Sequence, residues 1–289
     1  YGRLWVATRN GLAVREGIRF RTVAGPGEFN VGQAGHLDSN GTHLYVAMKG
    51  GVAAIPLDGK DLGILLPGPE QEKDNRAYAV HIDPQGIVWA GYGVQLCRVA
   101  NGRLEPVAGT GLPTEQWEAI ITDQSGTLWL RSMEQLWRRR AGQLQFERVP
   151  GEFPRANNAV ALLLDDSRRV VVPSELGLLR DTGSGWERIG ESRGLPSEQT
   201  AHALWDQEGN LWVAMENYGI SRLLGKGAWT TWTTAEGLSN NRVVGFVRDP
   251  RGALWIGTKR GLNRMGPSPG EWKVFRKAQG LPSDEIRAI

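Results

Sequence analysis

His202 and Glu216 fall in the same stretch of the sequence and have side chains that can do chemistry. A histidine near a carboxylate can act as a general acid–base pair, because the two groups can pass a proton to and from a substrate. Glu216 is followed directly by Asn217 and Tyr218. A carboxylate, an amide and an aromatic ring in one short segment also suit the binding of sugar hydroxyls and a sugar ring. This stretch therefore favours either catalysis or the recognition of a polar ligand.

Metal and cofactor chemistry is not indicated. The four histidines, His36, His43, His81 and His202, lack the spacing of metal ligands, and the single cysteine, Cys97, cannot build a cysteine-based zinc site. No Gly-x-Ser-x-Gly nucleophile motif occurs. We therefore expect no metal and no cofactor. His36 and His81 share one position of the repeat described below, and we expect both to be structural.

Charge and hydrophobicity limit the partners of the chain. Its 289 residues include 34 basic and 31 acidic ones, and Arg138–Arg140 is the only dense basic cluster. Because a nucleic-acid binder concentrates positive charge on one face, we expect no nucleic-acid partner. No run approaches the roughly 20 apolar residues that cross a bilayer, so we expect no direct membrane contact. The chain starts without Met and in mid-pattern, which we interpret as a piece of a longer protein.

An internal repeat predicts the elements that must position these residues. An Asp-x-x-Gly turn followed by a short apolar strand recurs, although the copy at Asp165 lacks the Gly. The repeats start at Asp38, Asp83, Asp123, Asp165, Asp206 and Asp249, which are 40 to 45 residues apart. Each unit contains four short strand-like runs with turn residues between them and no helical periodicity. Four strands at this spacing are typical of one blade of a β-propeller.

The two ends of the chain are parts of the same unit. The chain begins with the second strand of a unit and ends within a first strand. We expect Glu285 to Ile289 to pair with Leu4 to Thr8, which would close the ring and remove an open sheet edge. The predicted fold is therefore all-β: residues 1–289 form a single seven-bladed β-propeller domain with four-stranded antiparallel blades.

Departures from the repeat are candidates for function, because the fold explains the residues that fit it. His202 stands where the other units have Ala or Gly, and Trp117 stands where they have smaller residues. Trp117 could stack on a sugar ring or plug the mouth of the channel. Eight residues before each Asp, the units carry acceptor side chains, which we expect to bond to local backbone, with a polar ring for a cation or sugar hydroxyls as the alternative. They are Asn30, Asn75, Glu115, Asn157, Glu198, Asn241 and Asp284.

The loops that open on one face of a propeller, together with the channel, are the expected ligand site, since pockets form at concave places where polar groups converge. The residues expected to bind the ligand are Asn75, Arg76, Tyr92, Gln116, Trp117, His202, Glu216, Asn217, Tyr218, Arg242, Lys259 and Arg260.

The unit from Gly237 to Arg264 resembles the two-component regulator propeller repeat. It carries an Asp-Pro-Arg-Gly turn at 249–252, Trp-Ile-Gly-Thr at 255–258 and Gly-Leu-Asn-Arg at 261–264. The resemblance extends over the whole chain. The copies at Asp165 and before Tyr45 depart from it most.

The resemblance implies a sensor. In that family such propellers form the extracytoplasmic part of membrane-anchored bacterial regulators. It implies binding of a small polar ligand, such as a carbohydrate, and a signal passed to an output domain, a histidine kinase or a diguanylate cyclase, whose motifs this chain lacks. It also implies a periplasmic location, a chain that is not itself an enzyme, and a homodimer formed through the parent protein.

Two other functions stay open. Propeller lyases that open a cyclic lactone share this style of repeat and use a His with a nearby Glu, which makes His202 and Glu216 a conceivable pair. Such a lyase should place both side chains around one water or metal. The second alternative is a protein-interaction or dimerisation platform, with a flat top face or outer-strand aromatic residues as its contact surface.

Overall fold

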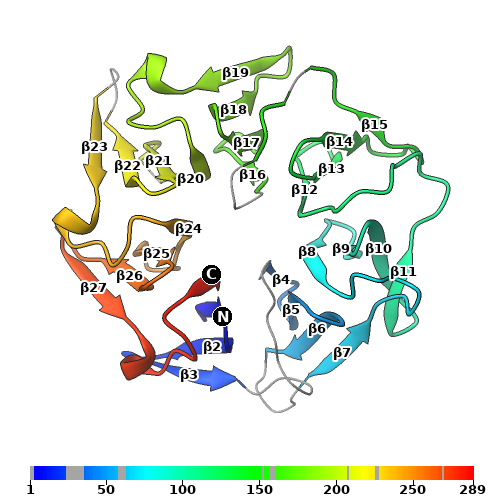
Figure 1. The fold of residues 1–289 in the computed structure, drawn as a ribbon, viewed down its shortest axis with the longest axis horizontal. Coiled ribbons are helices and arrows are strands. Elements are labelled where there is room, and N and C mark those ends of the chain that lie inside the picture. Colours follow the sequence, from blue (N-terminus) through cyan, green and yellow to red (C-terminus); the bar gives the residue numbers. More distant parts are fainter. Residues whose placement is uncertain are drawn as a thin grey trace.

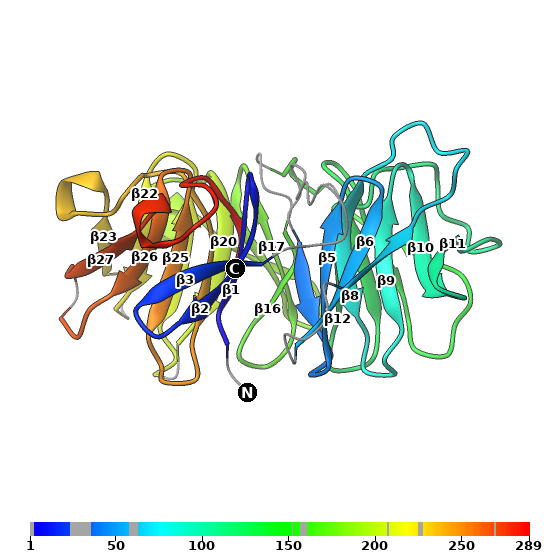
Figure 2. The same ribbon diagram turned by 90° about the horizontal axis from the view of Figure 1, so that it is seen from below.

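The computed structural model describes residues 3–23, 36–57, 63–151, 153–156, 161–206, 208–224, 228–268 and 270–289. The strands of this part form seven antiparallel sheets of four strands each. Figure 1 shows the sheets arranged as blades around a central axis, and Figure 2 shows the ring from the side. The predicted seven-bladed β-propeller is confirmed.

Each blade runs from an inner strand at the axis to an outer strand at the rim (Figure 1). The first blade contains β28 (Ile286–Ala288), β1 (Trp5–Thr8), β2 (Gly11–Glu16) and β3 (Arg19–Val23). The next three are β4 (Leu37–Ser39), β5 (His43–Met48), β6 (Gly51–Pro56) and β7 (Ile64–Pro67); β8 (Ala77–Ile82), β9 (Val88–Tyr92), β10 (Gln95–Ala100) and β11 (Arg103–Pro106); and β12 (Ala119–Thr122), β13 (Leu128–Arg131), β14 (Leu136–Arg139) and β15 (Glu147–Arg148).

The last three blades have the same order of strands. They are β16 (Leu163–Leu164), β17 (Val170–Ser174), β18 (Gly177–Asp181) and β19 (Trp186–Ile189); β20 (Thr200–Trp205), β21 (Leu211–Met215), β22 (Gly219–Leu223) and β23 (Trp229–Trp232); and β24 (Val243–Arg248), β25 (Leu254–Thr258), β26 (Gly261–Met265) and β27 (Trp272–Phe275). In the described part of the chain, three short 3₁₀ turns follow outer strands: η1 (Glu191–Arg193), η2 (Thr234–Glu236) and η3 (Lys277–Gln279). No helix in the described ranges is long and apolar enough to cross a membrane.

One carboxylate holds the first turn of each regular blade. Oδ1 of Asp249 accepts hydrogen bonds from the backbone N–H groups of Arg251 and Ala253, and Oδ2 accepts one from the Trp255 indole at 3.0 Å. Gly252 has a φ of 82°, a left-handed conformation that glycine adopts without strain. The same indole bond joins Trp89 to Asp83, Trp129 to Asp123 and Trp212 to Asp206. The repeated Asp, Gly and Trp thus cap the turn and anchor the second strand.

The two irregular copies keep the carboxylate and change its partner. Nε of Arg180 donates to Oδ2 of Asp165 at 2.7 Å, in the place of the missing indole, and Arg168 has a φ of 57° in the place of the missing Gly. Oδ2 of Asp38 accepts from the backbone N–H of Ile82 in the next blade at 2.8 Å. In both of these blades the carboxylate is therefore retained, and only the group that donates to it differs from the regular repeat.

The ring closes through its ends, as predicted. Strand β28 pairs with β1 in antiparallel register, with Ala288 opposite Ala7 and Ile286 opposite Thr8. Beyond the strands, the N–H of Arg9 donates to the carbonyl of Glu285 at 2.9 Å. Ile286 is fully buried. The chain's last strand is therefore the innermost strand of its first blade.

The hydrophobic core lies between neighbouring blades. At the closure, Phe20 of the first blade contacts Trp255 and Phe275 of the last, with ring centroids 6.2 and 5.5 Å apart. Outer-strand tryptophans also join blades: the indoles of Trp229 and Trp272 each donate at 2.9 Å to a carbonyl of the preceding blade's 3₁₀ turn. These contacts make the packing continuous around the ring.

Candidate functional site

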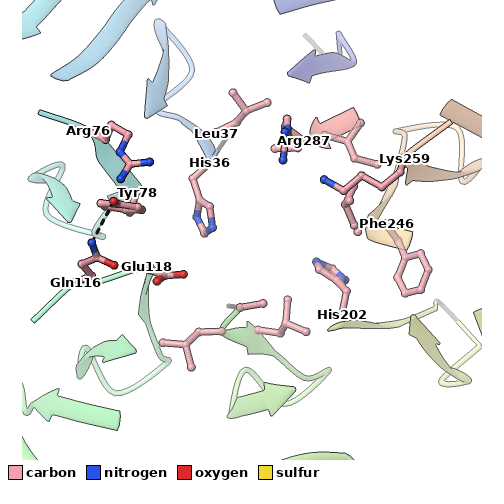
Figure 3. Close-up of a pocket in the computed structure, with 17 residues that line it drawn as sticks. His36, Leu37, Arg76, Tyr78, Gln116, Glu118, His202, Phe246, Lys259 and Arg287 are labelled. Carbon is pink, nitrogen blue, oxygen red and sulfur yellow. Dashed lines mark hydrogen bonds between the residues drawn. The ribbon is translucent and has the colours of Figure 1, made fainter. Parts of the chain in front are cut away.

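A cavity of about 500 Å³ lies at the axis of the ring. Its wall contains residues from, or directly before, all seven inner strands, and Figure 3 shows their side chains. Leu37, Leu163 and Phe246 supply apolar surface, and charged or polar side chains from several blades supply the rest. The volume is in the range of roughly 300–1,000 Å³ typical of small-molecule sites.

Bulges at the start of the inner strands turn extra side chains toward this cavity. The register shifts between Ala77 and Ala79 in β8, between Thr200 and His202 in β20, and between Val243 and Gly245 in β24. A bulge sets two residues opposite one and breaks the alternation of faces. As a result, Tyr78 and Val244, which lie within bulges, line the cavity. His202 and Gly245, which directly follow bulges, line it as well.

On one side of the cavity, Asp74 organises a hydrogen-bond network. It accepts two bonds from Arg76, at 2.7 and 3.1 Å, and another from the Tyr78 hydroxyl. The Gln116 amide lies 3.1 Å from the same hydroxyl. The bond from Arg76 lowers the pKa of Asp74, and burial together with the bond to Asp74 raises the pKa of Tyr78. The network therefore presents donors and acceptors with no surplus charge.

Glu118 brings a carboxylate to the same side, and Arg131 balances it. Burial raises the pKa of Glu118, while the positive charge of Arg131 opposes that rise. Arg131 is almost fully buried and donates to the carbonyls of Ala161 and Pro154. Burial lowers the pKa of Arg131 to about 10, so its guanidinium remains charged at neutral pH.

Lys259 and Arg287 form a cationic group on the other side of the cavity. Nζ of Lys259 and Nη2 of Arg287 lie 3.3 and 2.8 Å from the same atom, Oε1 of Glu285. Burial and the nearby charge of Arg287 lower the pKa of Lys259, although Glu285 opposes this. In Figure 3, Lys259 extends toward the middle of the cavity from the side opposite Glu118.

Two histidines complete the wall. Figure 3 shows the rings of His36 and His202 directed into the cavity, and His202 meets Phe246 edge to face at 5.4 Å. Burial lowers the pKa of each to about 4, so both rings are neutral near pH 7 and can donate one hydrogen bond and accept another. His36 was expected to be structural from its place in the repeat, but it lines the cavity. His81 is structural as expected, contacting Thr122 and Asp38 in the blades on either side.

Four of the predicted ligand-binding residues line the cavity, namely Arg76, Gln116, His202 and Lys259. The cavity wall also contains Tyr78, Glu118 and Arg287, which are not among the predicted ligand-binding residues. All three stand five residues before the Asp position of the repeat, whereas His202 stands four residues before it. Strict alternation of side chains along a strand would therefore place the three on the opposite face from His202. The sequence did contain a signal for these three residues. They are polar or charged at a position that holds Ala201 or Val244 in other blades.

Two predicted residues with aromatic rings, Trp117 and Tyr92, are buried in the core. Trp117 is fully buried in a cluster with Trp89 and Leu130, and its carbonyl packs so closely on Gly91 that any Cβ there would collide with it. Tyr92 is 3% exposed, with its ring packed on Gly68. Neither ring faces the cavity, because the bulk of each fills space between strands.

The remaining predicted residues lie outside the cavity wall. Glu216 is buried and its Oε1 lies 3.1 Å from Nε of Arg242. Asn217 occupies the tip of its loop with a φ of 63°, and Tyr218 next to it is 51% exposed. Asn75 and Arg260 are exposed. Since Glu216 does not line the cavity that His202 faces, the acid–base pair suggested by the sequence is not assembled there.

Of the acceptors at the position eight residues before the Asp, Glu198, Asn241 and Asp284 accept a local backbone N–H as expected, whereas Glu115 accepts from a side chain. Glu198 accepts from Arg188 at 2.6 Å, and Glu115 accepts from Gln135 at 3.2 Å. Asn241 and Asp284 each accept a backbone N–H of the preceding 3₁₀ turn, at 2.7 and 2.8 Å. Two members of the set, Asn30 and Asn157, lie outside the described residues. Among the described residues, no group of His, Cys, Asp and Glu is arranged to hold a metal ion.

The last complete blade matches a known family. Residues 237–260 match the model described as two component regulator propeller. These residues are a two-component regulator propeller repeat. The match confirms the resemblance at the unit whose motifs carried it, and the blades at Asp83, Asp123 and Asp206 share its Asp–Trp bond. No curated protein matches the chain.

Three solved structures share the fold and are distant from this chain in sequence. The extracellular domain of the hybrid two-component system BT4673 from B. thetaiotaomicron is 15% identical, with a TM-score of 0.52, and the alignment covers 94% of this chain and 45% of that one. PorZ, a surface component of the type-IX secretion system of Porphyromonas gingivalis, is 16% identical, with a TM-score of 0.68 and coverages of 92% and 45%. Virginiamycin B lyase from Staphylococcus aureus is 15% identical, with a TM-score of 0.64 and coverages of 88% and 94%. The chain thus spans less than half of the first two proteins.

Proposed function

We propose that this propeller is the extracytoplasmic sensor domain of a bacterial two-component regulator, and that its central cavity binds a small polar ligand such as a sugar. The observation that carries the proposal is the cavity at the axis, where polar side chains from several blades converge. The regulator repeat at residues 237–260 supports the sensing role. The BT4673 extracellular domain, a structure with the same fold, supports the location.

The wall suits a ligand with hydroxyl groups and an apolar face. Tyr78, Gln116 and the two neutral histidines offer donors and acceptors on different sides of the cavity. Phe246 and Leu163 offer apolar surface between them. Small-molecule sites combine mostly apolar walls with a few placed polar groups, and sugars use both.

Signalling is the second part of the proposal. A ligand that contacts several inner strands would tie blades together across the axis, and it would stabilise the ring by its binding free energy. We propose that an output domain of the parent regulator, a histidine kinase or a diguanylate cyclase, responds to this change. Because Glu216 is paired with Arg242 outside the cavity, the proposed role of this chain is binding without turnover.

A cavity-filling variant tests the proposal. Ala161 lines the cavity, so Ala161→Phe should occupy part of the volume and block a ligand. We expect members of a panel of mono- and disaccharides and sugar acids to raise the melting temperature of the native chain and to bind in isothermal titration calorimetry. Ala161→Phe should weaken that binding at least about tenfold, equivalent to about 1.4 kcal/mol.

Ala141→Phe is the matched control, because Ala141 is exposed and outside the cavity wall. It should bind as the native chain does. Binding that survives unchanged in a folded Ala161→Phe protein would place the ligand elsewhere and contradict the proposal.

A further inference from the structure

Most charges around the cavity are compensated by a partner within the wall or just behind it. Arg76 is paired with Asp74 through two hydrogen bonds. Glu118 faces the cavity with the buried guanidinium of Arg131 close enough to oppose the rise in its pKa that burial causes. Each of these pairs is neutral, so neither selects a charged ligand.

The group at Lys259 and Arg287 is different, because two cations share one carboxylate. Both approach the same oxygen of Glu285, and Arg9 lies 3.6 Å from the other oxygen. Arg242, which also lowers the pKa of Lys259, is itself paired with Glu216. The group therefore retains at least one positive charge that no described carboxylate balances.

That surplus charge is partly buried, which makes it significant for binding. The Lys259 and Arg287 side chains are 22% and 17% exposed, and both line the cavity. A charge removed from water keeps more of its electrostatic strength than one on an open surface. An unbalanced partly buried cation costs free energy in the empty protein, and an anion bound beside it would recover that cost.

We infer that the ligand is a monoanion, a small hydroxylated carboxylate whose charged end binds between Lys259 and Arg287 while its hydroxyl groups reach the neutral network of Tyr78 and Gln116 across the cavity. This inference rests on the proposed function, because it concerns the same cavity. Within the cavity wall, Lys259 and Arg287 together carry one positive charge more than Glu285, which matches a single carboxylate. Sugar acids such as uronic and aldonic acids have this chemistry.

Paired acidic and neutral probes test the inference. D-galacturonate, D-glucuronate and D-gluconate should bind the native chain in titration calorimetry at low ionic strength, whereas D-galactose and D-glucose should bind at least about tenfold more weakly. Sodium chloride should weaken the binding of the acids more than that of the neutral sugars, because salt screens the charge.

Variants at the cationic group identify the residues. Lys259→Gln should weaken sugar-acid binding at least about tenfold, because it removes one of the two cations that hold the carboxylate. Lys259→Arg keeps the charge and should retain most of the affinity. Arg251→Gln is the control for a general loss of positive charge, since Arg251 is exposed on the turn of the same blade. Circular dichroism and melting temperature verify that each variant is folded.

The possible results separate the two proposals. If neutral sugars bind as tightly as the acids, or Lys259→Gln leaves acid binding unchanged, the monoanion inference is wrong while the binding role of the cavity stands. If neither acids nor neutral sugars bind in a manner sensitive to Ala161→Phe, both proposals are overturned.

Discussion

At the scale of single residues, burial decides the protonation of the two cavity histidines. Both rings lie in the cavity wall, and their removal from water holds the pKa of each at about 4, compared with about 6.5 for an exposed histidine. For His202 the nearby His36 lowers the pKa further. Near neutral pH the wall therefore offers two uncharged imidazoles, which is a hydrogen-bonding surface and not a cationic one.

This depression has a definite consequence for stability. Between about pH 6.5 and pH 4, His202 in the unfolded chain binds a proton that the folded chain does not, so folding stability falls as the pH falls through that window. His202→Gln should lose less stability than the native chain between pH 7 and pH 4.5. Urea unfolding at several pH values measures the difference, and parallel stability curves for the two proteins would contradict it.

At the scale of structural elements, the blade depends on the carboxylate at its first turn. In the blade that lacks both Gly and Trp, the buried Asp165 accepts from the N–H of Arg169 at 2.8 Å and from Arg180 at 2.7 Å. The carboxylate is thus the constant part of the turn, and its second partner is an indole in some blades and a guanidinium in this one.

Neighbouring aspartates allow a matched test of that turn. Asp165→Asn should destabilise the protein by about 1.5–3 kcal/mol, because a charge-assisted hydrogen bond is lost at a buried site. Asp166→Asn should change stability by less than about 0.5 kcal/mol, since that side chain is 56% exposed and lies 3.5 Å from Arg180. Chemical denaturation measures both, and equal effects would show that the buried turn bond is not the reason.

The repeat made the blades predictable, whereas the bulges hid part of the site. Asp and Trp at fixed spacing correspond to a hydrogen bond, so counting the repeats predicted the number of blades. The partial units at the two ends of the chain predicted the closure. The face of a residue was inferred from alternation, which the bulge in β8 breaks just at Tyr78. Trp117 departs from the repeat because its ring packs in a core cluster. A departure from the repeat therefore indicates a changed environment and not specifically a ligand site.

At the scale of the whole molecule, the ring depends on a short seam. Two residue pairs join β28 to β1, and the bond between Arg9 and Glu285 extends this pairing. Ile286 packs in the same core cluster as Phe20 and Trp255. The seam therefore combines few backbone bonds with a large shared apolar contact.

Ile286→Ala tests the contribution of the seam. Removing a fully buried isoleucine side chain should cost about 2–5 kcal/mol, and the loss should appear in the unfolding of the entire ring. Ile18→Ala, at a side chain that is 73% exposed, should stay within about 0.5 kcal/mol. Calorimetry measures both, and a separate early transition confined to one blade would contradict the closed-ring picture.

The antiparallel pairing of β1 and β28 also determines how the ring responds to mechanical force. The start of β1 lies beside the end of β28, so tension applied to the two termini loads the pairing bonds one after another, as in a zipper, and not all together in shear. Glu285, at the far end of that pairing, also holds Lys259 and Arg287 in the cavity wall. A pull strong enough to open the zipper would disperse the cationic group, so mechanical load and occupancy of the cavity would oppose each other.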